Sequence, residues 1–368
     1  MTFTKQLTDK LCKKRVVYSV TNVRGLCSNS CSPSDQWILT AKTSHGPKKL
    51  FMKVFFHSHE CMHEDVQKAC DALEYERKVY ENILPMTHYQ FFPVFWRAET
   101  NITFDELLLF LCNKIVVKKK KLKKSEISQR LLRNMKFMFE YDVNRPSLQS
   151  SNLLLKKDEM SKLGFLKKLK CQYLLIESFV GGVHSLYSML YCKHLQSEYE
   201  FWTVIHQVAC AIEALHKVKL QHNDLHYDNV MIQQKKTIYT RNNNRYQSPF
   251  KVFVFDFDRA YSSELGPNNI NDEYFEENYG ICNKFTEMSD LLYLTQCVSA
   301  IIGNSGILRM MSKSKDYSDQ MDQIFETFVE AEDTSYVLNH LPKYFDNFEA
   351  IIKKIEEYMQ FRKLKHRI

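Results

Sequence analysis

Residues 220–232, which read LQHNDLHYDNVMI, carry a dense group of polar side chains between apolar ones. The stretch contains two histidines, two aspartates and two asparagines. A surface loop needs no apolar flanks, and a buried strand cannot hold so many polar groups unless each has a partner. The stretch therefore predicts a short strand that ends in a polar loop built to hold a ligand.

The rest of the chain divides into a strand-rich front part and a helix-rich back part. Aromatic and β-branched residues between turn signals predict strands at 15–20, 37–42, 49–56, 91–96 and 171–179. Apolar residues at helical spacing predict helices at 66–84, 201–218, 289–302 and 345–361. A further strand, 251–260, ends in acidic residues. The two parts meet at Gly181 and Gly182, and such a junction is a common place for a ligand cleft.

Composition excludes several classes of protein. The 368 residues, 44% of them hydrophobic, can bury one large core or two moderate ones. The longest apolar stretches, such as 107–112, are far shorter than the roughly 20 residues that cross a bilayer. The first 14 residues lack an apolar core of signal-peptide length. We therefore expect a soluble intracellular protein whose 11 cysteines stay reduced.

Positive charge is concentrated in residues 113–170, which hold 14 Lys and 3 Arg against 5 acidic residues. The net charge of the whole chain is only +8, so this basic segment sits on an otherwise slightly acidic protein. Its densest part, KKKKLKK at 118–124, can contact nucleic acid, an anionic membrane or an acidic partner. A solvated face or loop without a partner is the alternative.

A second cluster, at residues 57–63, alternates His57, His59, Cys61 and His63. These side chains are of the types that bind Zn²⁺. Structural zinc sites usually pair ligands from two separated segments, which favours the alternative of a polar loop after a strand.

A buried ion pair is indicated in the front part. Lys53 lies inside an apolar strand, where an unpaired ammonium would be costly. Glu76 and Glu74 on the next helix are its candidate partners. Glu76 is favoured because Tyr80 and Ile83 follow it at i+4 and i+7, on an inward-facing stripe.

The back part supplies oxygen-bearing side chains. Asp224 and Asn229 lie five positions apart, and Asp256 ends a later strand. Phosphoryl transfer needs a cation at the phosphates, oxygen ligands for Mg²⁺, and a carboxylate where the acceptor hydroxyl loses its proton. These residues and Lys53 provide groups of all three kinds.

The chain resembles the protein-kinase-like fold. HNDLHYDNV at 222–230 matches the catalytic-loop pattern H-x-D-x-x-x-x-N, VFDFD at 254–258 takes the place of Asp-Phe-Gly, and FMKVFF at 51–56 matches the lysine strand. HNDLHYDNVMI, FDFDRA and YGICNKF with DLLYL are similar to Ser/Thr protein kinases of large nucleocytoplasmic DNA viruses and, distantly, to haspin-like kinases.

The resemblance implies an α+β, bilobal protein-kinase-like fold. A strand-rich N-lobe at 1–177 would carry a basic helical insertion at about 100–170. A helix-rich C-lobe at 178–368 would contain the catalytic loop and a divergent activation segment.

The resemblance also implies roles for single residues. Asp224 would be the catalytic base, and Asn229 and Asp256 would hold Mg²⁺, with Mn²⁺ as a possible substitute. Lys53 would hold the α/β-phosphates of ATP, and Glu76 would hold Lys53.

Further implied roles concern the loop and the adenine pocket. His222 would brace the loop, and His226 would meet the γ-phosphate from the acceptor side. In YLLIESFVGG, Ile176 would be the gatekeeper, and Glu177 and Phe179 would offer backbone groups to adenine.

The sequence departs from the family pattern at several points. The expected phosphate loop, 22–36, contains only Gly25, which is the candidate phosphate contact. Asn223 replaces the Arg of regulated kinases, which predicts activity without activation-loop phosphorylation. Asp258 stands where glycine is usual, as a structural residue or a third metal-facing acid. Asp290 resembles the helix acid that holds the catalytic loop.

We therefore expect an ATP-dependent kinase that phosphorylates Ser or Thr of protein substrates. A small-molecule phosphotransferase of the aminoglycoside or choline kinase type and an ATP-binding pseudokinase scaffold are the alternatives. The acidic segment 259–289 predicts a basic or polar acceptor site. The resemblance further implies the host cytoplasm and possible packaging in a virion. The sequence gives no indication of oligomeric state.

Overall fold

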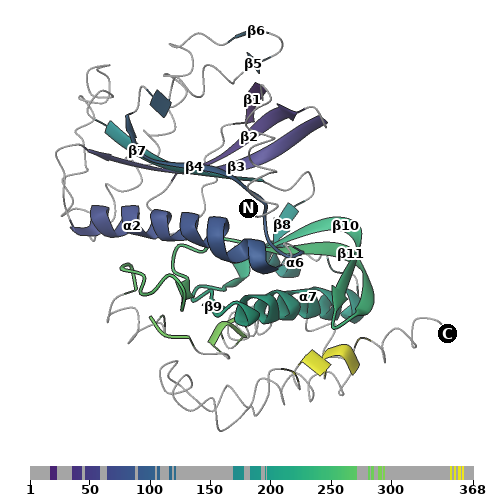
Figure 1. Ribbon diagram of the computed structural model, residues 1–368. Helices are drawn as coiled ribbons and strands as arrows, with labels where there is room; N and C mark the ends of the chain where they lie inside the picture. Colours follow the sequence, from purple (N-terminus) through teal and green to yellow (C-terminus); the bar gives the residue numbers. More distant parts are fainter. Residues whose placement is uncertain are drawn as a thin grey trace. The chain divides into compact units, whose positions relative to one another are not determined.

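A computed structural model of the chain describes its main helices and strands (Figure 1). The described residues are 17–22, 35–43, 46–58, 64–87, 90–103, 106–107, 116–117, 120–121, 169–177, 183–191, 195, 197–271, 281, 283–285, 289–291, 293–294, 349, 352–353, 355–357 and 359. The chain forms two compact units. The first comprises Met1–Arg77 and Val94–Val180, and the second comprises Lys78–Pro93 and Gly181–Ile368.

The first unit contains a five-stranded antiparallel sheet in the order β1-β2-β3-β7-β4. Its strands are β1 (Val17–Asn22), β2 (Asp35–Thr43), β3 (Gly46–Ser58), β7 (Leu169–Glu177) and β4 (Phe95–Thr103). Strand β3 is the central strand of the sheet. Its consecutive residues Met52, Lys53 and Val54 are all buried, although side chains along a strand point to alternate faces. A polar side chain on this strand therefore lies in the core.

Helix α2 (Glu64–Lys78) runs alongside this sheet (Figure 1). It continues into a π-helical turn, Val79–Ile83, and a 3₁₀ turn, Leu84–Thr87. The helix predicted at 66–84 is thus confirmed, although its last turn is widened. The inward stripe includes Leu73, Glu76 and Tyr80, which are all buried.

The strand predicted at 91–96 is wrong in its first half, because β4 begins only at Phe95. Pro93 has no backbone N–H to give to a sheet, and residues 91 and 92 form a bend before it. The carbonyl of Phe91 instead accepts a hydrogen bond from the N–H of Val254 at 2.8 Å.

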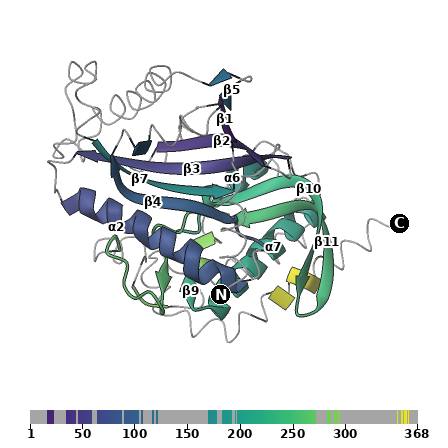
Figure 2. The same ribbon diagram turned by 45° about the horizontal axis from the view of Figure 1, so that its top comes forward.

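The second unit is built on helix α7 (Glu198–Lys217) and a long hairpin of β10 (Val230–Arg241) and β11 (Asn244–Val254), which lie side by side (Figure 2). The hairpin turn is Asn242–Asn243, and both residues have positive φ, as a type I′ turn requires. This hairpin is not among the elements predicted from the sequence, and the strand predicted at 251–260 ends at Val254.

Smaller elements complete the second unit. Strand β8 (Val183–Ser185) pairs with the other edge of β10, and α6 (Leu186–Tyr191) follows it. Strand β9 (Leu220–Gln221) pairs with β12 (Tyr261–Ser262). Helix α7 confirms the prediction at 201–218 and begins at the N-cap Ser197, whose hydroxyl accepts from the N–H of Glu200.

The C-terminal predictions are covered only in part. The described residues within 289–294 and 349–359 are helical, as predicted, and the rest of both segments lies outside the described residues. Most of the basic segment 113–170 also lies outside them. Its described part includes the short pair β5 (Val116–Val117) and β6 (Lys120–Lys121). In the part of the chain that the structure describes, no helix has the length and apolarity to cross a membrane.

Arg241, a buried residue at the end of β10, forms an ion-pair network with three glutamates. It contacts Glu213 of α7 and Glu356 of the C-terminal segment, both at 3.1 Å, and also Glu349. One guanidinium thus joins the hairpin, the central helix and the C-terminal helical segment of the second unit.

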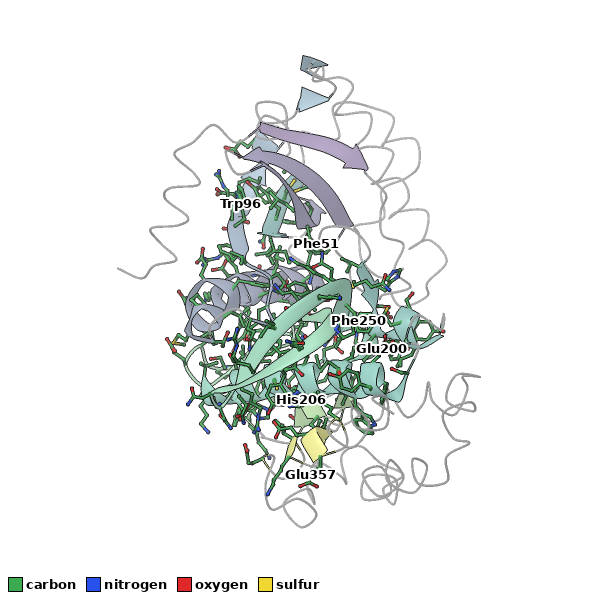
Figure 3. The ribbon with its side chains drawn as sticks, turned by 90° about the vertical axis from the view of Figure 1, so that its right-hand side faces the viewer. Phe51, Trp96, Glu200, His206, Phe250 and Glu357 are labelled. Carbon is green, nitrogen blue, oxygen red and sulfur yellow. The ribbon has the colours of Figure 1, made fainter. Side chains whose placement is uncertain are left out.

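His206 of α7, which is labelled in Figure 3, belongs to the same network. Its Nδ1 lies 2.7 Å from the hydroxyl of Tyr239, and its Nε2 lies 3.2 Å from Glu356. A neutral ring satisfies both contacts when Nδ1 accepts from the hydroxyl and Nε2–H donates to the carboxylate. Burial lowers the pKa of His206, and the field of Glu356 opposes this shift without reversing it.

Removal of Arg241 should destabilise the protein markedly. The change Arg241→Ala leaves Glu213 and Glu356 without their shared cation, and breaking a buried pair typically costs about 3–5 kcal/mol. Chemical denaturation measures the loss. The control is Arg245→Ala, at an exposed position of the same hairpin, where we expect a change within about 0.5 kcal/mol. Equal effects of the two changes would contradict a structural role for the network.

The buried His206 should make stability depend on pH. Because its pKa in the folded state is below the unfolded value of 6.5, the unfolded state binds more protons. Its contribution is therefore present above pH 6.5 and is lost as pH falls, by at most about 1.4 kcal/mol per pH unit. We expect the unfolding free energy of His206→Gln to fall less steeply than that of wild type between pH 7.5 and about 5.5. Parallel pH profiles would show that this histidine does not titrate on unfolding.

Candidate functional site

The first unit contains the buried ion pair that the sequence indicated. Lys53 Nζ on β3 lies 3.1 Å from Glu76 Oε2 on α2, and their side chains are only 5% and 2% exposed. Glu74 does not take this place, because its carboxylate pairs with Arg77 one turn away. Burial would penalise either charge alone, so each holds the other in its ionised form and fixes its direction.

In the second unit, one carboxylate fixes the start of the polar loop. Asp290 accepts from the backbone N–H of His222 at 2.8 Å and from that of Asn223 at 2.9 Å, one bond to each oxygen. Asp290 is buried, and burial raises its pKa, whereas the hydrogen bonds from the two backbone N–H groups favour the ionised form. The loop backbone is thereby anchored to the helical segment at 289–294.

His222 connects this loop to the end of β11. Its Nδ1 accepts from the N–H of Asp224 at 3.3 Å, and its Nε2 lies 3.0 Å from the carbonyl of Phe255. This arrangement requires the neutral tautomer with hydrogen on Nε2. Burial lowers the pKa of His222, which favours that neutral form. The imidazole therefore joins the loop to the residue that follows β11.

Asn229 lies at the end of the same loop and is oriented by it. Its side-chain nitrogen Nδ2 donates to the backbone carbonyl of Asp224 at 2.8 Å, and its backbone carbonyl accepts from the N–H of Phe255 at 3.3 Å. With the nitrogen engaged, the side-chain oxygen Oδ1 is the atom that Asn229 offers to a cation. Asp224, Asn229 and Phe255, which directly follows the end of β11, thus form one hydrogen-bonded assembly.

Asp256 directly follows this strand end and has a φ of +70°, a region that few residues other than glycine adopt. The next residue, Phe257, is fully buried. Its ring packs edge-on against Tyr80 and Phe92, with distances between ring centroids of 5.6 Å and 6.1 Å. This anchored ring leaves the flanking carboxylates Asp256 and Asp258 half-buried on a fixed turn.

His226 lies beside several carboxylates. Its Nδ1 accepts from the N–H of Asp228 at 3.1 Å and so caps the turn Tyr227–Asn229, while Nε2 lies 3.8 Å from Asp224 Oδ2. Burial lowers the pKa of His226, and the fields of Asp228, Asp256 and Asp258 oppose that shift. Because Nδ1 accepts, the hydrogen of the neutral ring is on Nε2, 3.8 Å from Asp224 Oδ2.

The remaining candidates for nucleotide contacts fall into two groups. Ile176 is buried on β7 opposite Phe51, and Glu177 ends the same strand opposite Leu50. Gly25 and Phe179 lie outside the described residues.

The proposed zinc ligands are only partly covered. His57 is buried on β3 and stacks on Phe55, whereas His59, Cys61 and His63 lie outside the described residues. Within the described ranges, no three His, Cys, Asp or Glu side chains gather in a way that could hold a metal ion.

Sequence reasoning also overlooked three asparagines, Asn268, Asn271 and Asn283. Their side-chain amides bind the backbone that follows Asp256. Their close spacing in GPNNIND and YGICN is a turn signal. That signal does not say which distant backbone groups the amides will bind.

The Asp290 anchor predicts a loss of stability on a nearly isosteric change. In Asp290→Asn an amide nitrogen replaces one acceptor oxygen, so one buried N–H of His222 or Asn223 loses its partner. This should lower the unfolding free energy by about 1–3 kcal/mol, as measured by chemical denaturation. The exposed Asp228→Asn in the same loop is the control and should stay within about 0.5 kcal/mol. An Asp290→Asn protein as stable as wild type would refute the anchor.

One comparison with known proteins matches the part of the chain that contains this loop. A family model described as the lipopolysaccharide kinase (Kdo/WaaP) family matches residues 166–273, which is less than half of the chain but includes Asp224, Asn229 and Asp256. No curated protein matches the chain.

Two solved structures are distantly similar. One is the yeast RNA Pol II CTD kinase CTDK-1 complex, at 12% identity and a TM-score of 0.31, over 65% of this chain and 50% of that chain. The other is WaaP in complex with acyl carrier protein, at 10% identity and a TM-score of 0.35, over 95% of this chain and 91% of that chain. This chain thus spans only half the length of the yeast chain. These scores are low, and neither structure bears on the activity of this chain.

Proposed function

We propose that the chain is an ATP-dependent phosphotransferase with a protein-kinase-like catalytic centre. The observation that carries the proposal is the hydrogen-bonded assembly of Asp224, Asn229 and the strand end before Asp256, held together by His222. Phosphoryl transfer depends mainly on positioning and on charge stabilisation, and a braced set of oxygen donors serves both.

Two residues of the second unit fit a bound Mg²⁺. Mg²⁺ takes oxygen ligands and is usually bound by one or two protein groups together with phosphates and waters. Asn229 Oδ1 and the Asp256 carboxylate would be the protein ligands. The bound metal would neutralise charge that develops on the transferred group. The role of Lys53, which pairs with Glu76 in the first unit, at the α/β-phosphates stays a prediction from the sequence.

Asp224 would accept or orient the proton of the acceptor hydroxyl. Its carboxylate is partly exposed, whereas its backbone is bonded at both N–H and carbonyl, so the side chain is accessible on a rigid support. Neutral His226 beside it can donate a hydrogen bond to the γ-phosphate without taking the proton that Asp224 must receive.

The acceptor we favour is a Ser or Thr hydroxyl of a protein, on the basis of the lysine strand and the segment YLLIESFVGG. The second candidate is a sugar hydroxyl. The match of residues 166–273 to a lipopolysaccharide kinase family favours it, because this segment holds the proposed catalytic residues.

Other parts of the sequence interpretation stay predictions. The viral and haspin-like likeness, the host cytoplasm and virion packaging belong to this group. So does contact of the basic segment 113–170 with nucleic acid or an acidic partner.

The test is transfer of radiolabelled γ-phosphate from ATP to a mixed protein substrate and, separately, to a panel of sugars. Loss of the catalytic carboxylate in Asp224→Asn should lower the rate by about 10²–10⁴-fold for the true acceptor class. The control, Asp71→Asn on α2, should retain wild-type rates, since Asp71 bonds to Gln67 one turn away.

The outcomes separate the candidates. Labelled protein supports the kinase acting on Ser or Thr, and labelled sugar supports the second candidate. Equal ATP turnover by wild type and Asp224→Asn would overturn both and favour the pseudokinase scaffold.

A further inference from the structure

The backbone that follows Asp256 is held by asparagine side chains. The carbonyls of Asp258, Arg259 and Ala260, three residues in a row, all accept hydrogen bonds from side-chain amides. Asn268 Nδ2 donates to Asp258 at 2.8 Å and to Ala260 at 3.0 Å. The middle carbonyl, of Arg259, receives two bonds.

One of these two bonds comes from a residue that precedes Arg259 in the chain, and the other comes from a residue that follows it. Asn223 Nδ2 donates to the Arg259 carbonyl at 3.0 Å, and Asn271 Nδ2 donates to it at 2.8 Å. Asn223 immediately precedes Asp224, and its own N–H is held by Asp290. The loop that carries the proposed base is therefore bonded directly to the segment that carries the proposed metal ligand.

A fourth asparagine, Asn283, holds the backbone of Asn268 and Asn271. Asn283 Oδ1 accepts from the N–H of Asn268 at 2.8 Å, and its Nδ2 donates to the carbonyls of Asn268 at 3.2 Å and Asn271 at 2.9 Å. We call Asn223, Asn268, Asn271 and Asn283 the amide clamp. Asn223, Asn268 and Asn271 are buried, so water competes little for these bonds.

We propose that the amide clamp positions Asp256 for metal binding without any phosphorylation, an inference that rests on the proposed phosphotransferase function. In kinases that are switched on by phosphorylation, a phosphate paired with Arg orders the corresponding segment. Here the residue before Asp224 is Asn223, whose amide is already bonded to the segment. The four residues are positioning residues, because they act on Asp256 through the backbone of 258–260.

The chemistry of the clamp has two consequences. Its bonds are between neutral groups, so salt should screen them little, unlike a pairing of phosphate with Arg. They are also permanent features of the sequence, so the arrangement of Asp256 should not depend on a second enzyme. The clamp therefore makes the centre constitutively assembled.

The test uses two isosteric changes, Asn223→Asp and Asn271→Asp, each of which replaces an amide donor to the Arg259 carbonyl by a carboxylate. The readout is binding of Mn²⁺ with a non-hydrolysable ATP analogue by titration calorimetry, alongside the free Mg²⁺ concentration that gives half-maximal phosphate transfer. We expect both constants to weaken by roughly three- to tenfold in each variant, as for one lost hydrogen bond. Asn269→Asp, exposed in the same loop, is the control and should match wild type.

The outcomes can be told apart. A lower melting temperature with unchanged metal constants would show a merely structural role and overturn the clamp proposal. Wild-type protein that loses its turnover after phosphatase treatment would also overturn it. Wild type that binds the metal and nucleotide but transfers no phosphate would overturn the proposed function alone, since the binding constants of the variants still decide the role of the clamp. If Asn271→Asp does not fold, Asn223→Asp decides.

Discussion

The imidazole of His222 is the contact on which the candidate centre of the second unit depends. It joins the N–H of Asp224 to the carbonyl of Phe255 and so links two segments that are distant in sequence. Only the neutral ring can accept at one nitrogen and donate at the other, and burial holds it in that form. Asp290 holds the same part of the loop by accepting hydrogen bonds from the backbone N–H groups of His222 and Asn223. The geometry of the site is thus set by a few buried, satisfied bonds.

The hairpin explains why Asn229 and Asp256 can lie together although 27 positions separate them. Antiparallel pairing places Val230 opposite Val254, so the residues just outside this pair, Asn229 and Phe255, are also neighbours. The two-residue turn at Asn242–Asn243 closes the hairpin and fixes its register. In this chain, the spacing between the loop and the later acid is a consequence of strand length.

Local patterns in the sequence predicted the buried ion pair and the polar loop. Helical periodicity distinguished Glu76 from Glu74, and the polar loop was recognisable from its spacing. The long hairpin was missed because strand pairing depends on contacts between segments that are far apart in sequence. The prediction of a strand at 91–96 was wrong in its first half because Pro93 has no N–H to donate to a sheet, whatever the aromatic pattern around it. The amide clamp was missed because side-chain bonds to distant carbonyls leave no periodic signal.

A crystal structure of the chain with Mg²⁺ and a non-hydrolysable ATP analogue tests the central claim most directly. The account predicts a metal ion bound at about 2.0–2.1 Å by Asn229 Oδ1 and an oxygen of Asp256. It also predicts the Asp224 carboxylate beside the γ-phosphate. A nucleotide bound elsewhere, or a metal ion held without Asn229 and Asp256, would contradict it.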